Sequence, residues 1–392
     1  PWVRALREAL DRPLTSYYLL LGASALLLTI GLIMVLSASS VYSYQQYGDS
    51  YAIVRRQAVW VLIGLPVAWV ATRMSTRWIR RFTWLAYLVS LALLLLVAFM
   101  GVAVNGNQNW LALGPLRIQP SEIAKLSLIL WAANVYANKE RRLGSLHELL
   151  VPVVPGMLLA TGLVILGRDL GTGLVFFAIL LGMLWIAGAP AKLFGLAATI
   201  VTVGAFGLAT VDQGRVTRLT NFFDPFKDFQ GAGWQAGHGL YALSSGGVFG
   251  EGIGASTQKW GNLPEAHTDF IFAVIGEELG LVGTLLVIAL FLTIAYAALR
   301  VAARTADPFV RYVTFGIVVW LIGQMVINVG MVLALLPVIG IPLPVVSYGG
   351  SALLPPLAAL GLVIGFARRE PEAARALAAR RKARSAGLSA HR

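Results

Sequence analysis

The sequence predicts an all-α polytopic membrane protein. Of its 392 residues, 58% are hydrophobic and only 12% are charged, a composition far from that of water-soluble domains. The apolar residues also gather in long runs, and a helix needs roughly 20 of them to cross a bilayer core of about 30 Å. About ten such runs follow one another along the chain. We therefore expect about ten transmembrane helices.

The expected helices are joined by short connections, with one exception. They cover residues 17–38, 57–71, 84–104, 120–136, 149–166, 170–187, 193–210, 270–301, 312–336 and 345–366. The second is short and begins within the amphipathic stretch around Arg55 and Arg56. The exception is a large extracytoplasmic loop, residues 211–267, between the seventh and eighth helices. It is rich in glycine and mixes aromatic with basic residues, which is typical of a lid or binding wall, or else of a partly ordered cap.

Basic residues predict the orientation in the membrane. They concentrate in the connections after the second, fourth and eighth helices and in the C-terminal tail, and such connections stay in the cytoplasm. We expect a cytoplasmic N-terminus of residues 1–15, a transmembrane domain of residues 16–367 and a basic cytoplasmic tail of residues 368–392. The net charge of +13 is explained by these segments, without any binding of nucleic acid.

The residues that could hold a metal are few. The chain has no cysteine and only four scattered histidines. Disulfides are therefore excluded, and a zinc or iron cluster is not expected.

Charged residues inside the expected helices are candidates for function, because burying a charge near the bilayer centre costs from about 3 kcal/mol upward. Glu122 and Lys125, in QPSEIAKL, lie on one face of the fourth helix. They predict either a diphosphate-binding lysine held by its glutamate or an ion pair that joins two helices, and both remain open. The neighbours Glu277 and Glu278 cannot face the same group, so at least one is expected to face a polar cavity. Asp169 lies in the very short turn between the fifth and sixth helices, where an ordinary solvated turn would explain it.

The stretch LPEAHTDFIF places several polar residues directly before the eighth helix. Asp269 lies there at the outer helix end, where the first-turn N–H groups favour an anion. Thr268 or Asp269 could cap the helix, but a cap explains neither Glu265 nor His267 beside them. The alternative is that Asp269 is a general base toward a sugar hydroxyl.

Several separated motifs together resemble one known family. In chain order they are LIMVLSAS, QPSEIAK, DLGTG, LPEAHTDFIFAVIGEELGLVG and NVGMVLALLPVIGIPLPVVSYGGSALL. Over nearly its whole length the chain resembles the SEDS family of bacterial cell-envelope proteins, which includes FtsW of division and RodA of elongation. IGEELG and NGNQNWL are closer to the FtsW branch, whereas GIPLPVVSYGG is shared with the RodA branch. The resemblance favours an FtsW-like protein with the SEDS fold, in the bacterial cytoplasmic membrane.

The resemblance implies an enzyme. Its expected activity is that of a peptidoglycan glycosyltransferase, which polymerises lipid II into β-1,4 glycan strands on the outer face of the membrane and releases undecaprenyl diphosphate. The donor sugar is α-linked, so the product requires inversion by direct attack of the acceptor's 4-hydroxyl. The family's essential carboxylate falls on Asp269, which would take the proton of that hydroxyl. The candidate substrate-binding residues are Lys125, Glu122, Asp169, Lys259, Arg215, His267 and Glu278.

Two positions depart from the family pattern. Arg168 stands where a proline often precedes the aspartate of DLGT, which puts the role of Asp169 in doubt. Ala334 stands where the C-terminal signature usually has glycine or threonine, a difference that concerns helix packing.

The resemblance also implies a cofactor and a partner. No intrinsic cofactor is expected, although a divalent cation such as Mg or Mn could be held together with the substrate diphosphate. The expected partners are a class B penicillin-binding transpeptidase and other division proteins. Three alternatives remain: a lipid II flippase without chemistry, a non-catalytic scaffold for the transpeptidase, and a RodA-type role in elongation.

Overall fold

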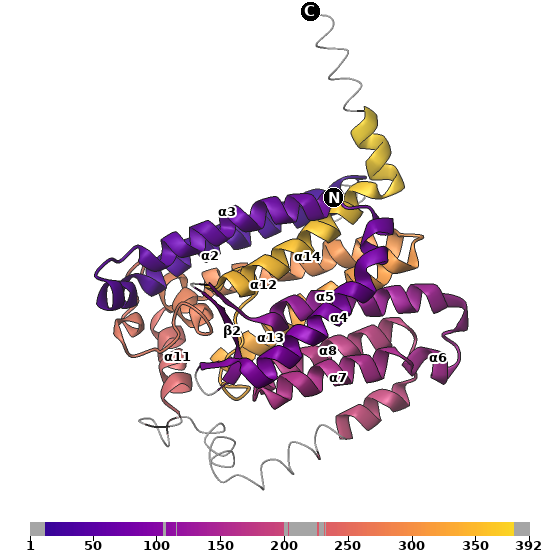
Figure 1. Cartoon of the computed structure of the whole chain (residues 1–392). Coiled ribbons are helices and arrows are strands. Elements are labelled where there is room, and N and C mark those ends of the chain that lie inside the picture. The colour runs from indigo at the N-terminus through magenta and orange to yellow at the C-terminus, as the bar shows by residue number, and fades with distance from the viewer. Residues whose placement is uncertain are drawn as a thin grey trace, which may run out of the picture.

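The computed structural model describes residues 12–379 except 105–106, 115 and most of 200–232, where only residues 203, 226 and 231 are described. The described chain is a bundle of long helices (Figure 1). Their bounds are α2 (Thr15–Tyr47), α3 (Ala52–Arg73), α4 (Thr76–Met100), α5 (Pro120–Lys139), α6 (Leu146–Leu150), α7 (Val153–Leu166), α8 (Leu170–Ile186), α11 (Trp234–Ser245), α12 (Ile271–Arg304), α13 (Pro308–Val332) and α14 (Gly350–Arg369). Two 3-10 helices are η1 (Glu140–Arg142) and η2 (Gln258–Trp260).

The predicted membrane helices are found close to their expected positions. Within the described residues, seven helical segments are long and apolar enough to cross a membrane, with α6 and α7 forming one of them. The more polar α5 and the shorter α8 coincide with the expected fourth and sixth helices. Residues 191–199 are helical at the start of the expected seventh helix. The remainder of that helix lies almost wholly outside the described residues.

The core of the bundle is formed by α5, α12, α13 and α14. Much of α13 is buried, including Trp320 and Phe309 at 0% exposure. α3 runs along α14 (Figure 1), where a Cβ on Gly361 would lie 2.4 Å from the carbonyl oxygen of Ala68 and one on Gly365 would lie 2.5 Å from that of Thr72. Small residues let helix backbones approach closely, a common basis of helix packing in membranes.

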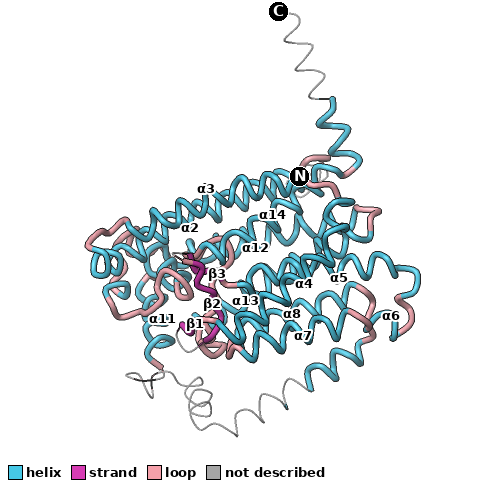
Figure 2. Tube along the Cα trace, viewed as in Figure 1, coloured by secondary structure: helices cyan, strands magenta, loops and turns pink. Residues whose placement is uncertain are grey.

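One small sheet interrupts the all-α pattern. The strands β1 (Val102–Val104), β2 (Asn107–Leu113) and β3 (Leu116–Ile118) form an antiparallel sheet in the order β1-β2-β3. It lies at the end of the bundle beyond α4 and before α5 (Figure 2). The expected third helix over residues 84–104 was therefore wrong at its end, because α4 stops at Met100 and Gly101 begins the turn into β1.

The helix α12 is broken near its beginning. Gly280 has φ 67° and ψ −163°, a conformation outside the helical region that is nearly restricted to glycine. The backbone groups freed by this break are bonded to residues 247–252, the segment GVFGEG. A non-helical backbone at membrane depth is tolerated where protein groups satisfy it.

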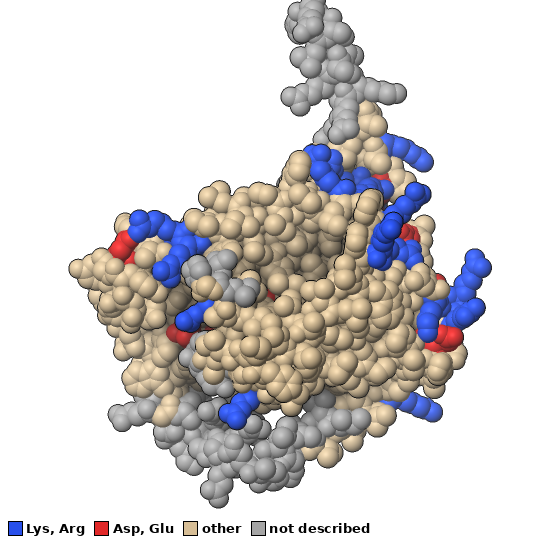
Figure 3. All heavy atoms as spheres, viewed as in Figure 1, with Lys and Arg blue, Asp and Glu red and all other residues tan. Residues whose placement is uncertain are grey.

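The two ends of the bundle differ in charge. On the face shown in Figure 3, most Lys and Arg side chains gather at the end where α14 finishes. The exposed Arg73, Arg77, Arg141 and Arg304 lie in the connections at that end or in the helix ends beside them. The opposite end carries the sheet, α11 and the segment that leads into α12 (Figure 1).

Candidate active site

The segment before α12 holds Asp269 at the less basic end of the bundle. Asp269 is half-buried, and its backbone carbonyl accepts a 2.8 Å hydrogen bond from the side chain of Asn328 on α13. No described residue donates a hydrogen bond to its carboxylate. A Cβ on Gly340 would lie 3.3 Å from Asp269 Oδ2, so this glycine leaves space beside the carboxylate. The backbone is therefore fixed while the carboxylate is left available.

The connection between α13 and α14 supports the same segment. Ser347 Oγ donates to the carbonyl of Thr268 at 2.6 Å, and the N–H of Tyr348 donates to that of His267 at 3.0 Å. Asn328 also donates to the carbonyl of Ile341 at 2.7 Å. The prolines and glycines of PVIGIPLPVVSYGG thus break the helical path, as the sequence predicts, and hold the residues around Asp269.

Asp269 does not cap α12. The N-cap position is occupied by Phe270, and no side chain caps the helix there. Thr268 instead donates its hydroxyl to the Glu265 side chain at 2.6 Å. The structural explanation that competed with a catalytic role for Asp269 is therefore wrong.

Burial dominates the electrostatics of Asp269. It raises the pKa of the Asp269 carboxyl to about 7, and the negative charges of Glu265 and Asp169 act in the same direction. A carboxylate with this pKa is matched to general-base catalysis near neutral pH. Burial also lowers the pKa of His267, against an opposing effect of Glu265, which favours the neutral imidazole.

The ring of His267 lies between two tyrosines. It is stacked on Tyr42 of α2 with a centroid distance of 5.3 Å, and it contacts Tyr348 at 5.5 Å. Tyr42 is 45% exposed. Aromatic faces therefore lie beside the segment that carries Asp269, although His267 itself is buried.

Glu122 and Lys125 form the predicted pair, deep in the bundle. Lys125 Nζ donates to Glu122 Oε1 at 2.7 Å and to Gln324 Oε1 at 3.0 Å, and both charged side chains are 1% exposed. Gln324, on α13, also accepts from the indole of Trp320 at 2.8 Å and donates to the carbonyl of Pro342 at 2.9 Å. The pair thus joins α5 to α13 and, through Gln324, to the α13–α14 connection. A role of Lys125 toward diphosphate remains a prediction and requires this network to open.

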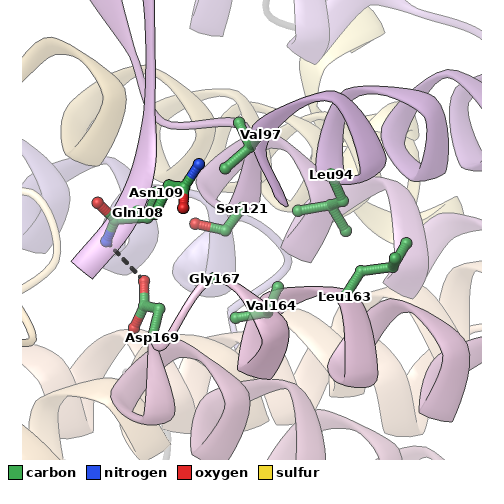
Figure 4. A pocket seen from close by; sticks show the side chains of 9 residues that line it. All are labelled: Leu94, Val97, Gln108, Asn109, Ser121, Leu163, Val164, Gly167 and Asp169. Carbon is green, nitrogen blue, oxygen red and sulfur yellow. Dashed lines mark hydrogen bonds between the residues drawn. The ribbon is translucent and has the colours of Figure 1, made fainter. Parts of the chain in front are cut away.

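Asp169 is buried rather than part of a solvated turn. It caps α8, with Thr172 donating its N–H and its hydroxyl at 2.9 Å each, and Asn109 of β2 donating at 2.8 Å. Figure 4 shows that Asp169 and Asn109, joined by this hydrogen bond, line a small cavity together with Ser121. Arg168, before it, has φ 64°, which proline cannot adopt. The chain path here is therefore incompatible with the proline that is common in the family.

The acidic pair on α12 differs from its prediction. Glu277 and Glu278 are 1% and 0% exposed, and the expectation that one faces a polar cavity was wrong. Glu277 accepts from Ser256 and Thr257, whereas Glu278 accepts from Lys259 at 3.0 Å. Both carboxylates are used to bind the connection between α11 and α12. The predicted site residue Arg215 lies outside the described residues.

Other polar residues of this region were not predicted. Gln324 and Asn328 stand one helical turn apart on α13. Gln324 bonds to Lys125 and to the α13–α14 connection, and Asn328 bonds to the carbonyls of Asp269 and Ile341. Polar side chains in an apolar helix are themselves a signal of function, so the sequence did contain a sign of them. In the part of the chain that the structure describes, no three His, Asp or Glu residues gather to form a metal site.

Comparisons with known proteins agree on one family. The family model FtsW/RodA/SpoVE, described as a cell cycle protein, matches residues 17–371. A relative from Mycobacterium tuberculosis, "Probable peptidoglycan glycosyltransferase FtsW", is 42% identical over 374 residues, which are 95% of this chain and 71% of the relative. Two solved structures have similar folds. A chain of a peptidoglycan synthase complex has a TM-score of 0.74 and 28% identity, covering 90% of this chain and 97% of that chain. RodA of Thermus thermophilus has a TM-score of 0.66 and 29% identity with the same coverage of both chains.

Proposed function

The chain belongs to the FtsW/RodA/SpoVE family of cell cycle proteins, and on this premise we propose that it is a peptidoglycan glycosyltransferase of the FtsW type. Its substrate is lipid II, which it polymerises into β-1,4 glycan strands during cell division. The FtsW relative supports the division role by its name and its 42% identity over 95% of this chain.

One observation of the site carries the proposed chemistry. Asp269 is half-buried, its backbone carbonyl is held by Asn328, and no described residue donates a hydrogen bond to its carboxylate. A general base needs a fixed position, a pKa near the working pH and a free acceptor oxygen. Burial raises the pKa of Asp269 to about 7, so Asp269 meets all three requirements.

In the proposed reaction, Asp269 accepts the proton of the acceptor sugar's 4-hydroxyl as its oxygen attacks the donor's anomeric carbon. The bond between that carbon and the diphosphate oxygen breaks, and undecaprenyl diphosphate leaves with the bonding electron pair. A single displacement inverts the α-linkage to the β-linkage. Negative charge develops on the leaving diphosphate, and basic groups that approach it would stabilise the transition state.

The candidates for this second role are Arg215 and the buried Lys125 and Lys259. A divalent cation could contribute as well, carried by the phosphates of the substrate. Among the described residues, no three His, Asp or Glu side chains gather into a metal site.

The outer face of the membrane is the proposed location of the reaction. The basic connections lie at the end of the bundle opposite Asp269, and the positive-inside rule assigns that end to the cytoplasm. Both termini are then cytoplasmic. A class B penicillin-binding transpeptidase is the proposed partner, supported by the similarity to a chain of a peptidoglycan synthase complex.

A flippase is less well supported than a polymerase. The intramembrane residues that suit a transport path are Glu122, Lys125, Glu277 and Glu278, which are at most 1% exposed. Each is bonded to other protein groups. They form the interior of the bundle in this conformation and do not line an open path.

The test is polymerisation of labelled lipid II by the purified protein with its transpeptidase, the latter blocked by a β-lactam. Asp269→Asn keeps the shape of the side chain and removes the base, so we expect a rate reduction of about 100-fold or more. Asp307→Asn is the matched control, since Asp307 caps α13 at the far end of the bundle. Equal rates for wild type and Asp269→Asn would remove Asp269 as the base, and a scaffold would give no polymer from either.

A further inference from the structure

The connection between α11 and α12 is hydrogen-bonded to the backbone of the first part of α12. The N–H groups of Glu251 and Gly252 donate to the carbonyls of Glu277 and Glu278 at 3.0 Å each. In the other direction, Leu281 donates to the carbonyl of Gly247 at 3.0 Å. These bonds bracket the break at Gly280, so the connection replaces the helical bonds that the break removes.

The approach of the two backbones is close. A Cβ on Gly246 would lie 1.9 Å from the carbonyl oxygen of Gly276, and one on Gly250 would lie 2.2 Å from that of Glu278. Nearer to Asp269, a Cβ on Gly239 of α11 would lie 3.0 Å from the ring of Phe270. The glycine-rich segment therefore packs closely against the whole first part of α12.

Buried side chains join the same elements to α2. Lys259 Nζ donates to Glu278 Oε1 at 3.0 Å and to Ser37 Oγ at 3.1 Å, and Ser37 Oγ donates to Glu278 Oε1 at 2.6 Å. All three side chains are at most 6% exposed. These three residues, here called the clamp, connect η2, α2 and α12. A charged pair withdrawn from water is costly unless its geometry and hydrogen bonds are good, and each member of the clamp has both others as partners.

We propose that the clamp of Ser37, Lys259 and Glu278 positions Asp269 for the reaction. Residues 271–279 of α12 begin two residues after Asp269 and end at the break at Gly280. The helical hydrogen bonds of the rest of α12 therefore do not fix their direction. The clamp and the backbone bonds join them to residues 246–260 and to α2 as one rigid block. The three are positioning residues, and their role rests on the proposed function.

This role competes with the prediction that Lys259 binds the diphosphate. The variant Glu278→Gln separates the two, because it keeps the shape of residue 278 and removes its charge. If Lys259 binds phosphate, the loss of its competing carboxylate frees the lysine, and KM for lipid II falls. If the clamp positions Asp269, the weakened clamp lowers kcat and leaves KM within about twofold.

We expect kcat to fall by about 10-fold to 100-fold in Glu278→Gln and in Lys259→Met, because small displacements of a catalytic group have effects of this size. The double variant should lose little more than either single one. Ser37→Ala removes both hydrogen bonds of the Ser37 hydroxyl but leaves Lys259 and Glu278 paired with each other. This variant provides the test if Lys259→Met fails to fold. Lys139→Met is the control, since it breaks the Lys139–Glu148 pair at the other end of the bundle.

Hydrogen exchange tests the clamp without reference to activity. The amides of residues 265–279 should exchange faster in Glu278→Gln and Ser37→Ala than in wild type, and at the wild-type rate in Lys139→Met. Unchanged exchange in the clamp variants, or a change in KM alone, would overturn the proposal. A wild-type protein without polymerase activity but with faster exchange in the clamp variants would contradict the proposed function and leave the clamp intact.

Discussion

Asp269 and Glu265 lie close enough for their charges to interact at the beginning of α12. Burial, together with the smaller effects of the Glu265 and Asp169 charges, raises the pKa of Asp269 to about 7. A base must be ionised, so kcat should fall as pH drops below about 7, by about tenfold for each further unit. Neutralising Glu265 removes a negative neighbour and lowers the pKa of Asp269. The acid limb of the kcat profile of Glu265→Gln should therefore lie at lower pH than that of wild type.

Glu265→Gln removes the charge of residue 265 without removing its hydrogen-bond acceptor. Glutamine at position 265 can still accept the hydrogen bond from Thr268, so the local structure should persist. A profile of kcat against pH for both proteins, at saturating lipid II, decides the outcome. An acid limb that stays in place in Glu265→Gln would show that another group than Asp269 governs it.

The sequence predicts single charged residues better than their partners. The spacing of Glu122 and Lys125 predicts their pairing, and the 2.7 Å bond confirms it. The third member, Gln324, comes from α13, and no local pattern connects it to α5. Ala334 illustrates a similar limit, because its φ of 52° is unusual for alanine. The resemblance implies glycine or threonine at this position, and the expectation that the difference concerns helix packing was wrong, because Ala334 lies beyond the end of α13 at Val332. The backbone conformation supplies the physical reason for glycine there.

At the break in α12, backbone conformation and close packing both restrict which residue can occupy one position. Gly280 has φ 67°, and a Cβ there would lie 2.4 Å from the backbone nitrogen of Gly250. Gly280→Ala adds an unfavourable backbone conformation, which costs on the order of 3 kcal/mol or less, and an overlap with backbone that cannot move aside. We expect a lower midpoint of thermal unfolding in detergent, together with a loss of polymerase activity.

The matched control for Gly280 is another glycine in a membrane helix. Gly323 lies within α13, and a Cβ there would meet nothing within 4 Å. Gly323→Ala should be neutral, or should stabilise the helix by about 0.5–1 kcal/mol, because alanine loses less conformational freedom on folding. Similar midpoints for the two variants would contradict the account of the break.

Elements were predicted where hydropathy alone determines them. Helices such as α2 and α13 follow from apolar runs of the length that a bilayer requires. The break at Gly280 could not be predicted, because it depends on bonds to residues 247–252, whose glycines are equally typical of a flexible loop. The sheet was missed for a related reason: its first strand continues the apolar run of α4, and pairing with β2 decides where the helix ends.

At the scale of the whole molecule, the two ends of the bundle have separate tasks. One end gathers the sheet, the short helix α11, the non-helical α13–α14 connection and the half-buried Asp269. The other end consists of short basic connections. A protein that works on a lipid-linked substrate at one face needs this asymmetry, since its reacting groups must reach water at that face while lipid surrounds the helices between.

The asymmetry predicts which ends chemical reagents can reach. The chain contains no cysteine, so a single introduced thiol reports on its own position. Tyr51, in the α2–α3 connection at the Asp269 end, is 60% exposed, and Ser145 is exposed in the connection between α5 and α6. In intact cells, a membrane-impermeant maleimide should label Tyr51→Cys and should label Ser145→Cys only after the membrane is permeabilised. The reverse pattern would place Asp269 in the cytoplasm, where it could not extend glycan strands outside the membrane.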